Sequence, residues 1–146
     1  MNDIKSVLII DDDEDDIFLI KDRLSKLVNE DCIFISSSDK HQSITLLKER
    51  TFDLCILDHR LAGFDGIDIL RAVAKAELAT PIIMLTGQND DDVAKKAIQS
   101  GAQDFVMKSS IDDEVFEKSV RYAISRKELE FARLLGKRSE AENVAK

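Results

Sequence analysis

Residues 54–66 read Leu-Cys-Ile-Leu-Asp-His-Arg-Leu-Ala-Gly-Phe-Asp-Gly, and this stretch decides the fold. Four apolar residues in succession fit a short strand that is buried on both faces, as in a parallel sheet covered by helices. The run ends at a carboxylate, Asp58, and the glycines that follow predict a loop. Asp58 is therefore expected at the carboxyl end of a buried strand, where open α/β sheets place their ligand sites.

A second strand near the N-terminus repeats this pattern. Residues 7–10 read Val-Leu-Ile-Ile, and Asp11, Asp12 and Asp13 follow directly. Because the carboxyl ends of parallel strands meet at one edge of a sheet, the carboxylates that follow both strands should gather there. Such a cluster of like charges is costly unless a cation lies within it. The sequence therefore predicts a cation site at this edge.

Apolar runs alternate with helical patterns along the first 125 residues. Strands are predicted at residues 6–10, 32–36, 54–57, 82–85 and 104–107. Helices are predicted over residues 13–29 and from about residue 39 to 50, and three more begin near residues 65, 90 and 112. This alternation with short connections predicts an α/β fold, a doubly wound parallel sheet of five strands with five helices on its two faces. Residues 1–125 would form this domain, and residues 126–146 a C-terminal helical extension or linker.

The last predicted helix should continue beyond the domain. It meets no glycine or proline before Gly136, so we expect it to extend to about Leu135. Ile124, Phe131 and Leu135 are spaced close to a coiled-coil seam. An apolar stripe too short to bury itself suggests pairing with the same helix of a second copy, giving a homodimer. A frayed amphipathic extension, or a linker cut from a longer protein, is the alternative.

Composition narrows the classes of function. The chain has 146 residues and a net charge of −8, which argues against direct contact with nucleic acid. It contains no apolar run of about 18 residues, so no membrane-spanning segment is predicted, and its first residues lack the apolar core of a signal peptide. Cys32 and Cys55 lie in apolar runs, which is typical of reduced core residues in a cytoplasmic protein. His41 and His59 are isolated in the sequence and predict no metal site of their own.

Polar residues mark the ends of four predicted strands, and their pattern is that of a known family. They are Asp11, Asp12, Asp58, Thr86 and Lys108. Asp65-Gly66 follows Asp58, and Phe105 precedes Lys108 by three positions. Over residues 5–125 this pattern resembles the receiver domain of two-component response regulators. The resemblance implies a flavodoxin-like sheet with strand order 2-1-3-4-5 and a signalling domain rather than an enzyme.

The resemblance also implies a phosphoacceptor and a metal. Asp58 would accept a phosphoryl group from a histidine kinase or a histidine phosphotransfer protein. Mg²⁺ would be held by Asp12, Asp58 and the backbone carbonyl of Arg60, with Asp11 acting mostly through water. This agrees with elementary chemistry, because phosphoryl transfer needs a nucleophile and charge neutralisation, and Mg²⁺ prefers hard oxygen ligands.

Two further roles follow from the same resemblance. Lys108 would place a positive charge on one phosphoryl oxygen, and Thr86 would donate a hydroxyl hydrogen bond to another. Thr86 and Phe105 would form the conformational switch. Arg60 and Gln88, two positions beyond Asp58 and Thr86, would border the site entrance and tune the lifetime of the phosphoryl group.

The sequence departs from the family pattern at two positions. Ala62 stands where the family usually has proline, so this loop should be somewhat freer. Ser109 stands where the family usually has a proline joined to the lysine by a cis bond. Because a cis bond without proline costs about 3–4 kcal/mol, the sequence leaves the Lys108–Ser109 isomer open.

Two rival functions remain open at the level of sequence. One is a Mg²⁺-dependent phosphohydrolase with an aspartyl nucleophile after the first strand, for which Asp11, Asp12 and Asp13 would be the candidates. Under the phosphohydrolase hypothesis, Asp58 and the Asp65-Gly66 loop would have no role in the chemistry. The other is a degenerate receiver that acts only as an interaction module.

Overall fold

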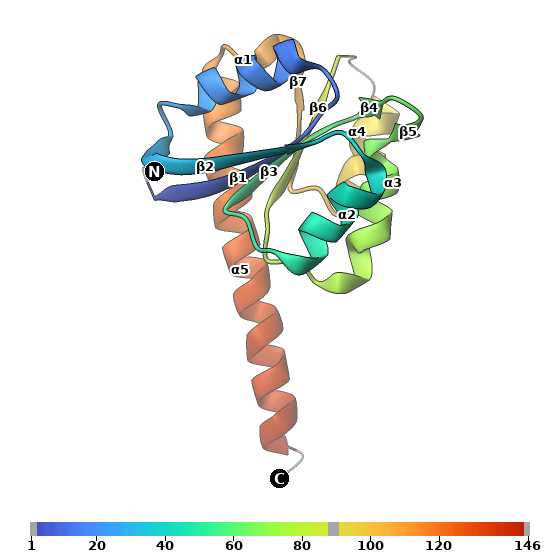
Figure 1. Ribbon diagram of the computed structural model, residues 1–146. Coiled ribbons are helices and arrows are strands. Elements are labelled where there is room, and N and C mark those ends of the chain that lie inside the picture. The colour runs from blue at the N-terminus through green and yellow to red at the C-terminus, as the bar shows by residue number, and fades with distance from the viewer. Residues whose placement is uncertain (1–2, 88–90, 145–146) are drawn as a thin grey trace.

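A five-stranded parallel sheet forms the centre of the protein (Figure 1). The computed structural model describes residues 3–87 and 91–144, and side chains as far as residue 136. The sheet strands are β1 (Ile4–Ile10), β2 (Val28–Ser37), β3 (Leu54–Asp58), β6 (Ile82–Thr86) and β7 (Asp104–Met107). Their order is β2-β1-β3-β6-β7, and every neighbouring pair is parallel.

The predicted fold class and strand order are confirmed. The labels differ because the loop after β3 contains two short strands, β4 (Arg60–Leu61) and β5 (Phe64–Asp65), which pair with each other and not with the main sheet. Without this hairpin, β6 and β7 are the fourth and fifth strands along the chain, and the order reads 2-1-3-4-5.

Five α-helices connect and cover the strands, in the order expected for a doubly wound sheet. They are α1 (Glu14–Leu24), α2 (Lys40–Glu49), α3 (Gly66–Val73), α4 (Asp91–Gln99) and α5 (Glu114–Val144). Asp13, Asp39 and Asp65 cap the first three helices, because their carboxylates accept hydrogen bonds from backbone N–H groups of the first turn. Short 3₁₀ turns, η1 (Ala74–Ala76) and η2 (Lys108–Ser110), follow α3 and β7. The predicted helix start at Asp90 lies outside the described residues.

The prediction that the first helix reaches residue 29 is wrong. α1 ends at Leu24, and Val28 already pairs with Ile4 in the sheet. Leu27 fits the helical spacing, but its N–H donates to the carbonyl of Leu24 in a turn. Strand pairing with β1 therefore overrides the local helical pattern, and β2 begins earlier than the predicted Cys32.

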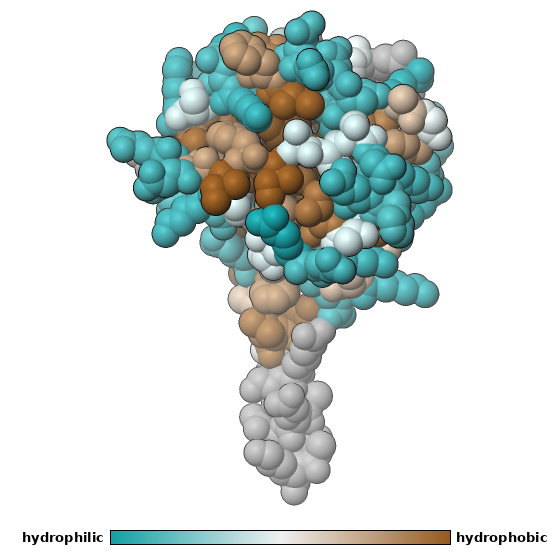
Figure 2. Space-filling view, viewed as in Figure 1, coloured by the Kyte–Doolittle hydropathy of each residue, from teal (hydrophilic) through white to brown (hydrophobic). Residues whose placement is uncertain are grey.

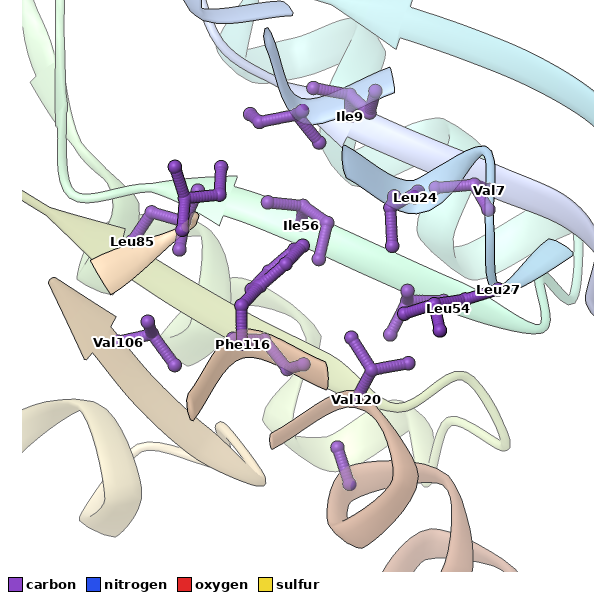
Figure 3. Close-up of a cluster of buried hydrophobic side chains, with 14 of the residues drawn as sticks. Val7, Ile9, Leu24, Leu27, Leu54, Ile56, Leu85, Val106, Phe116 and Val120 are labelled. Carbon is purple, nitrogen blue, oxygen red and sulfur yellow. The ribbon is translucent and has the colours of Figure 1, made fainter. Parts of the chain in front are cut away.

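Apolar side chains bury both faces of the sheet. On the face covered by α1 and α5, Phe116 and Val120 pack against residues of the central strands such as Ile56 (Figure 3). A second cluster on the other face includes Leu47 of α2 and Leu70 of α3. All five residues of β3 are buried. Because both faces are filled, polar chemistry is concentrated at the ends of the strands.

Helix α5 extends well away from the domain (Figure 1). It continues through Gly136 to Val144, further than the predicted Leu135. Two residues of the predicted apolar stripe, Ile124 and Phe131, do not project from the domain. Ile124 packs against the core, and Phe131 is partly buried and lines a cavity with Leu47 and Leu78. Leu135 is 49% exposed, and Figure 2 shows apolar surface where the helix leaves the domain. Within the described ranges, no helix is long and apolar enough to cross a membrane.

Candidate functional site

The carboxyl edge of the sheet brings three carboxylates together. Asp11 directly follows β1 and Asp58 is the last residue of β3, and these strands are neighbours in register. One carboxylate oxygen from each of Asp11, Asp12 and Asp58 lies within 4.8 Å of the others. Asp11 and Asp58 are buried, whereas Asp12 is exposed. The geometry therefore assembles the acid cluster that the sequence predicts.

Asp12 also ties this edge to the loop after β3. The backbone N–H of Ala62 donates to Asp12 Oδ2 at 2.7 Å. A proline at this position has no N–H and could not make the bond. The loop is therefore held at the position where the sequence predicted greater freedom.

Gly66 lies close against the backbone of Asp58. A Cβ atom on Gly66 would lie 2.3 Å from the carbonyl oxygen of Asp58, so only glycine fits there. The N–H of Gly66 donates to the carbonyl of His59 at 2.7 Å. The start of α3 thus packs directly against the end of β3 and holds Asp58 in place.

Lys108 supplies the positive charge of the site. It follows β7, and its Nζ lies 3.2 Å from Asp58 Oδ1 and 2.7 Å from Asp16 Oδ2. Burial lowers the pKa of Lys108, but the hydrogen bond that Lys108 donates to Asp16 and the charges of Asp58 and Asp11 outweigh burial and raise it. Lys108 therefore stays a cation. Asp16 was not predicted as a site residue, because in the sequence it reads only as part of an acidic helix start.

Thr86 ends β6 and lies beside a histidine that the sequence analysis set aside. Thr86 is 2% exposed, and its Oγ1 lies 3.4 Å from Nδ1 of His59. The other ring nitrogen of His59, Nε2, lies 3.2 Å from Asp65 Oδ2. His59 is itself buried. Its position directly after Asp58 was the one signal in the sequence that could have identified it.

Of the remaining predicted residues, the structure places Phe105 and Arg60. Phe105 of β7 is partly buried and packs against the cluster on the α2–α3–α4 face. Arg60 is exposed at the start of β4, and its backbone forms a hydrogen bond with the Asp58 carboxylate. The Lys108–Ser109 peptide bond is trans. Gln88 lies outside the described residues.

Burial makes two acids of this site, Asp11 and Asp58, hard to ionise. It raises the pKa of Asp11 to about 7, opposed by the hydrogen bond from the Asp13 N–H and assisted by the charge of Asp58. Burial likewise raises the pKa of Asp58, and the charge of Lys108 opposes that shift. Asp11 Oδ2 is buried and has no hydrogen-bond partner among the residues that the structure describes. A buried oxygen without a partner is costly, and a bound cation would satisfy it.

The donor set at this edge fits a hard divalent cation. Three carboxylates converge there, and one of their oxygens has no hydrogen-bond partner among the described residues. Mg²⁺ binds through one or two carboxylates and keeps several waters, which suits a cluster with one exposed member, Asp12. Sulfur and imidazole ligands are absent from the cluster.

The raised pKa of Asp11 predicts a pH dependence of stability in metal-free buffer. The folded protein holds this proton up to about pH 7, whereas the unfolded chain releases it near pH 3.8. The folded state thus binds more protons in this window, and the free energy of unfolding should fall by about 1 kcal/mol between pH 6 and pH 8. Urea denaturation with a chelator present would measure this. Asp11→Asn should flatten the trend, and an unchanged trend in that variant would contradict the assignment.

Comparisons with known proteins agree on one family. A family model described as the response regulator receiver domain matches residues 7–121. Transcriptional regulatory protein AfsQ1 of Streptomyces coelicolor is 31% identical over 126 residues, which cover 86% of this chain and 53% of that protein. DNA-binding response regulator MtrA of Mycolicibacterium smegmatis is 38% identical over 97 residues, covering 66% of this chain and 42% of that protein. The chain thus spans about half the length of these relatives.

Solved structures show the same architecture. The signal receiver domain of an HD domain-containing protein from Pseudomonas fluorescens has a TM-score of 0.74 and 27% identity, covering 89% of this chain and 93% of that one. The signal receiver domain of a protein described as a Luxo repressor, from Vibrio parahaemolyticus, has a TM-score of 0.73 and 25% identity, covering 88% and 96%. On its family model, its relatives and its fold, this chain belongs to the response regulator receiver domain family.

Proposed function

We propose that this chain is a phosphorylation-switched signalling module whose phosphoacceptor is Asp58. The observation that supports this most strongly is the position of the Asp58 carboxylate, which is buried between the acid pair that follows β1 and the ammonium of Lys108 at 3.2 Å. A nucleophile with a cation site on one side and a fixed positive charge on the other meets the needs of phosphoryl transfer.

The donor in this proposal is a phosphorylated histidine of a histidine kinase or of a histidine phosphotransfer protein. An Asp58 oxygen attacks phosphorus, a P–O bond forms while the P–N bond breaks, and the released imidazole nitrogen takes up a proton. Lys108 neutralises charge on one phosphoryl oxygen, and the Thr86 hydroxyl donates to another. Thr86 and Phe105 then change position, and this conformational change alters the surface of the domain.

Mg²⁺ belongs to the proposed site. Asp12, Asp58 and the backbone carbonyl of Arg60 would hold it, with Asp11 acting mostly through water. When bound, it supplies positive charge that offsets both the acid cluster and the phosphoryl oxygens. The residues of the chain do the remaining work. Asp58 provides the attacking oxygen, and Lys108 exchanges its bond with Asp16 for one with the phosphoryl group.

Incubation with acetyl phosphate and Mg²⁺ tests the function. We expect one phosphoryl group per chain, measured as a mass increase of the intact protein, and loss of the group in hydroxylamine, because an acyl phosphate is cleaved by it. Sustained hydrolysis of p-nitrophenyl phosphate would instead support the phosphohydrolase. A folded chain that takes up no phosphoryl group would support a receiver that only binds partners.

The proposed module comprises residues 1–125, with residues 126–146 as a helical extension and the cytoplasm as its location. Both cysteines are free, which suits that compartment. MtrA is described as a DNA-binding response regulator, but the match to this chain covers only 42% of MtrA. The DNA binding in that name belongs to the whole protein. The absence of direct nucleic-acid contact by this chain therefore stays a prediction.

We further infer weak self-association through the extension of α5. Leu135 is 49% exposed on a helix that projects from the domain, and Leu129 of the same helix is 53% exposed, whereas Ile124 and Phe131 are turned toward the domain. Only a few apolar side chains are therefore left for a partner. Burying one such side chain contributes about 1.5–3 kcal/mol, which gives a monomer–dimer equilibrium rather than a tight dimer. Sedimentation equilibrium should show association of the full chain that weakens in Leu135→Glu and disappears in a chain ending at Ser125. Equal association in all three would contradict this.

A further inference from the structure

The imidazole of His59 is buried between two polar side chains on different elements. Nε2 lies 3.2 Å from Asp65 Oδ2, and Nδ1 lies 3.4 Å from Oγ1 of Thr86. His59 is 5% exposed and Thr86 is 2% exposed. The second oxygen of Asp65, Oδ1, accepts the backbone N–H of Ile67 at 2.8 Å and caps α3. Oδ1 of Asp65 is thus bonded to the start of α3, and Oδ2 faces the ring of His59.

The contact with Asp65 favours one of the two neutral tautomers of His59. An ionised carboxylate can only accept a hydrogen bond, so the nitrogen facing Asp65, Nε2, must be the protonated one. In a neutral imidazole the other nitrogen is then an acceptor. In this tautomer Nδ1 can accept a hydrogen bond from the Thr86 hydroxyl, which lies 3.4 Å away.

Thr86 has one hydroxyl proton, and the proposed function needs it at the phosphoryl group on Asp58. We propose that His59 is a positioning residue that competes for this proton and so favours the unphosphorylated state. This inference rests on the proposed function, because the competition exists only if Thr86 donates to a phosphoryl oxygen. The 3.4 Å separation is at the long end for a hydrogen bond, so the hold is weak enough for a phosphoryl oxygen to overcome.

Asp65→Asn tests the proposal with little change in shape. The amide oxygen must take the place of Oδ1, because only it can accept the Ile67 N–H that caps α3. The amide NH₂ then faces Nε2, which must become the acceptor. Nδ1 carries the proton instead, and Thr86 is released from donating to it. Affinity for beryllofluoride, a mimic of the phosphoryl group, should rise about two- to fivefold in the presence of Mg²⁺, the range of one weak hydrogen bond.

His59→Phe should produce the same gain by removing the competing acceptor. The double variant with Asp65→Asn should gain no more than either single variant, because both act through one proton. In a Thr86→Val background, which lacks the hydroxyl, neither change should alter beryllofluoride affinity. Calorimetric titration of each variant measures these affinities, and circular dichroism checks that each is folded.

The imidazole ¹⁵N resonances of His59 provide a readout that a purely structural role would not change. They should show a proton on Nε2 in the wild-type chain and on Nδ1 in Asp65→Asn. A wild-type ring protonated on Nδ1 would overturn the proposal, as would equal beryllofluoride affinity in wild type, Asp65→Asn and His59→Phe. If the wild-type chain binds no beryllofluoride, the proposed function fails instead, and the NMR result still tests the contact.

Discussion

Asp58→Asn is expected to abolish phosphorylation by acetyl phosphate. The amide has no ionised oxygen to attack phosphorus, although it has nearly the size of the carboxylate and keeps an oxygen that can accept from Lys108. The variant should remain folded in metal-free buffer, because burial already raises the pKa of Asp58 and the change removes a costly charge. Loss of the phosphoryl adduct would therefore reflect chemistry and not unfolding.

A matched control for this variant is Asp31→Asn, which changes an exposed acid of β2 away from the carboxyl edge. It should take up one phosphoryl group, as the wild-type chain should. Intact-protein mass spectra of the three proteins under identical conditions give the comparison. An adduct that persists in Asp58→Asn, or one that resists hydroxylamine, would rule out Asp58 as the acceptor.

Asp12→Asn is expected to weaken Mg²⁺ binding by at least about tenfold, a loss typical of perturbed metal sites. Asp11→Asn should weaken it less, because its contact is expected through water. Mg²⁺ should raise the thermal stability of the wild-type chain by mass action, and this shift should shrink in Asp12→Asn. Titration calorimetry and melting curves at several Mg²⁺ concentrations would measure both effects.

Asp12→Asn has an opposite expected effect without metal. It removes a charge from a cluster whose members lie within 4.8 Å, so it should stabilise the chelator-treated protein. Thermal unfolding in chelator tests this against wild type. Equal Mg²⁺ affinity in wild type and Asp12→Asn would show that the metal is placed wrongly, whatever the effect on stability.

The fold could be predicted because its signals are local. The buried run before Asp58 and the similar run before Asp11 define the central strands without any tertiary information. The β4–β5 hairpin was missed because two-residue strands carry no periodic pattern. The overlong first helix was predicted because Leu27 and Val28 fit helical spacing, whereas pairing with β1 places Val28 in a strand.

The site was predictable as a set of strand ends but not as a set of contacts. Lys108 and Asp16 are 92 positions apart, and Thr86 and His59 are 27 positions apart. Their contacts depend on how side chains leave different elements, which no spacing in the sequence encodes. The same limit explains the tail, where helical spacing grouped Ile124 with Leu135 but could not show that Ile124 packs against the core.

Localising the phosphoryl group is the most direct test of the central claim. After reaction with acetyl phosphate and Mg²⁺, reduction with borohydride converts an aspartyl phosphate into homoserine and marks the modified residue permanently. Fragmentation mass spectrometry of the peptides should find this conversion at Asp58. Conversion at Asp11 or Asp12 would contradict the account and favour a nucleophile after the first strand, as in the rival phosphohydrolase.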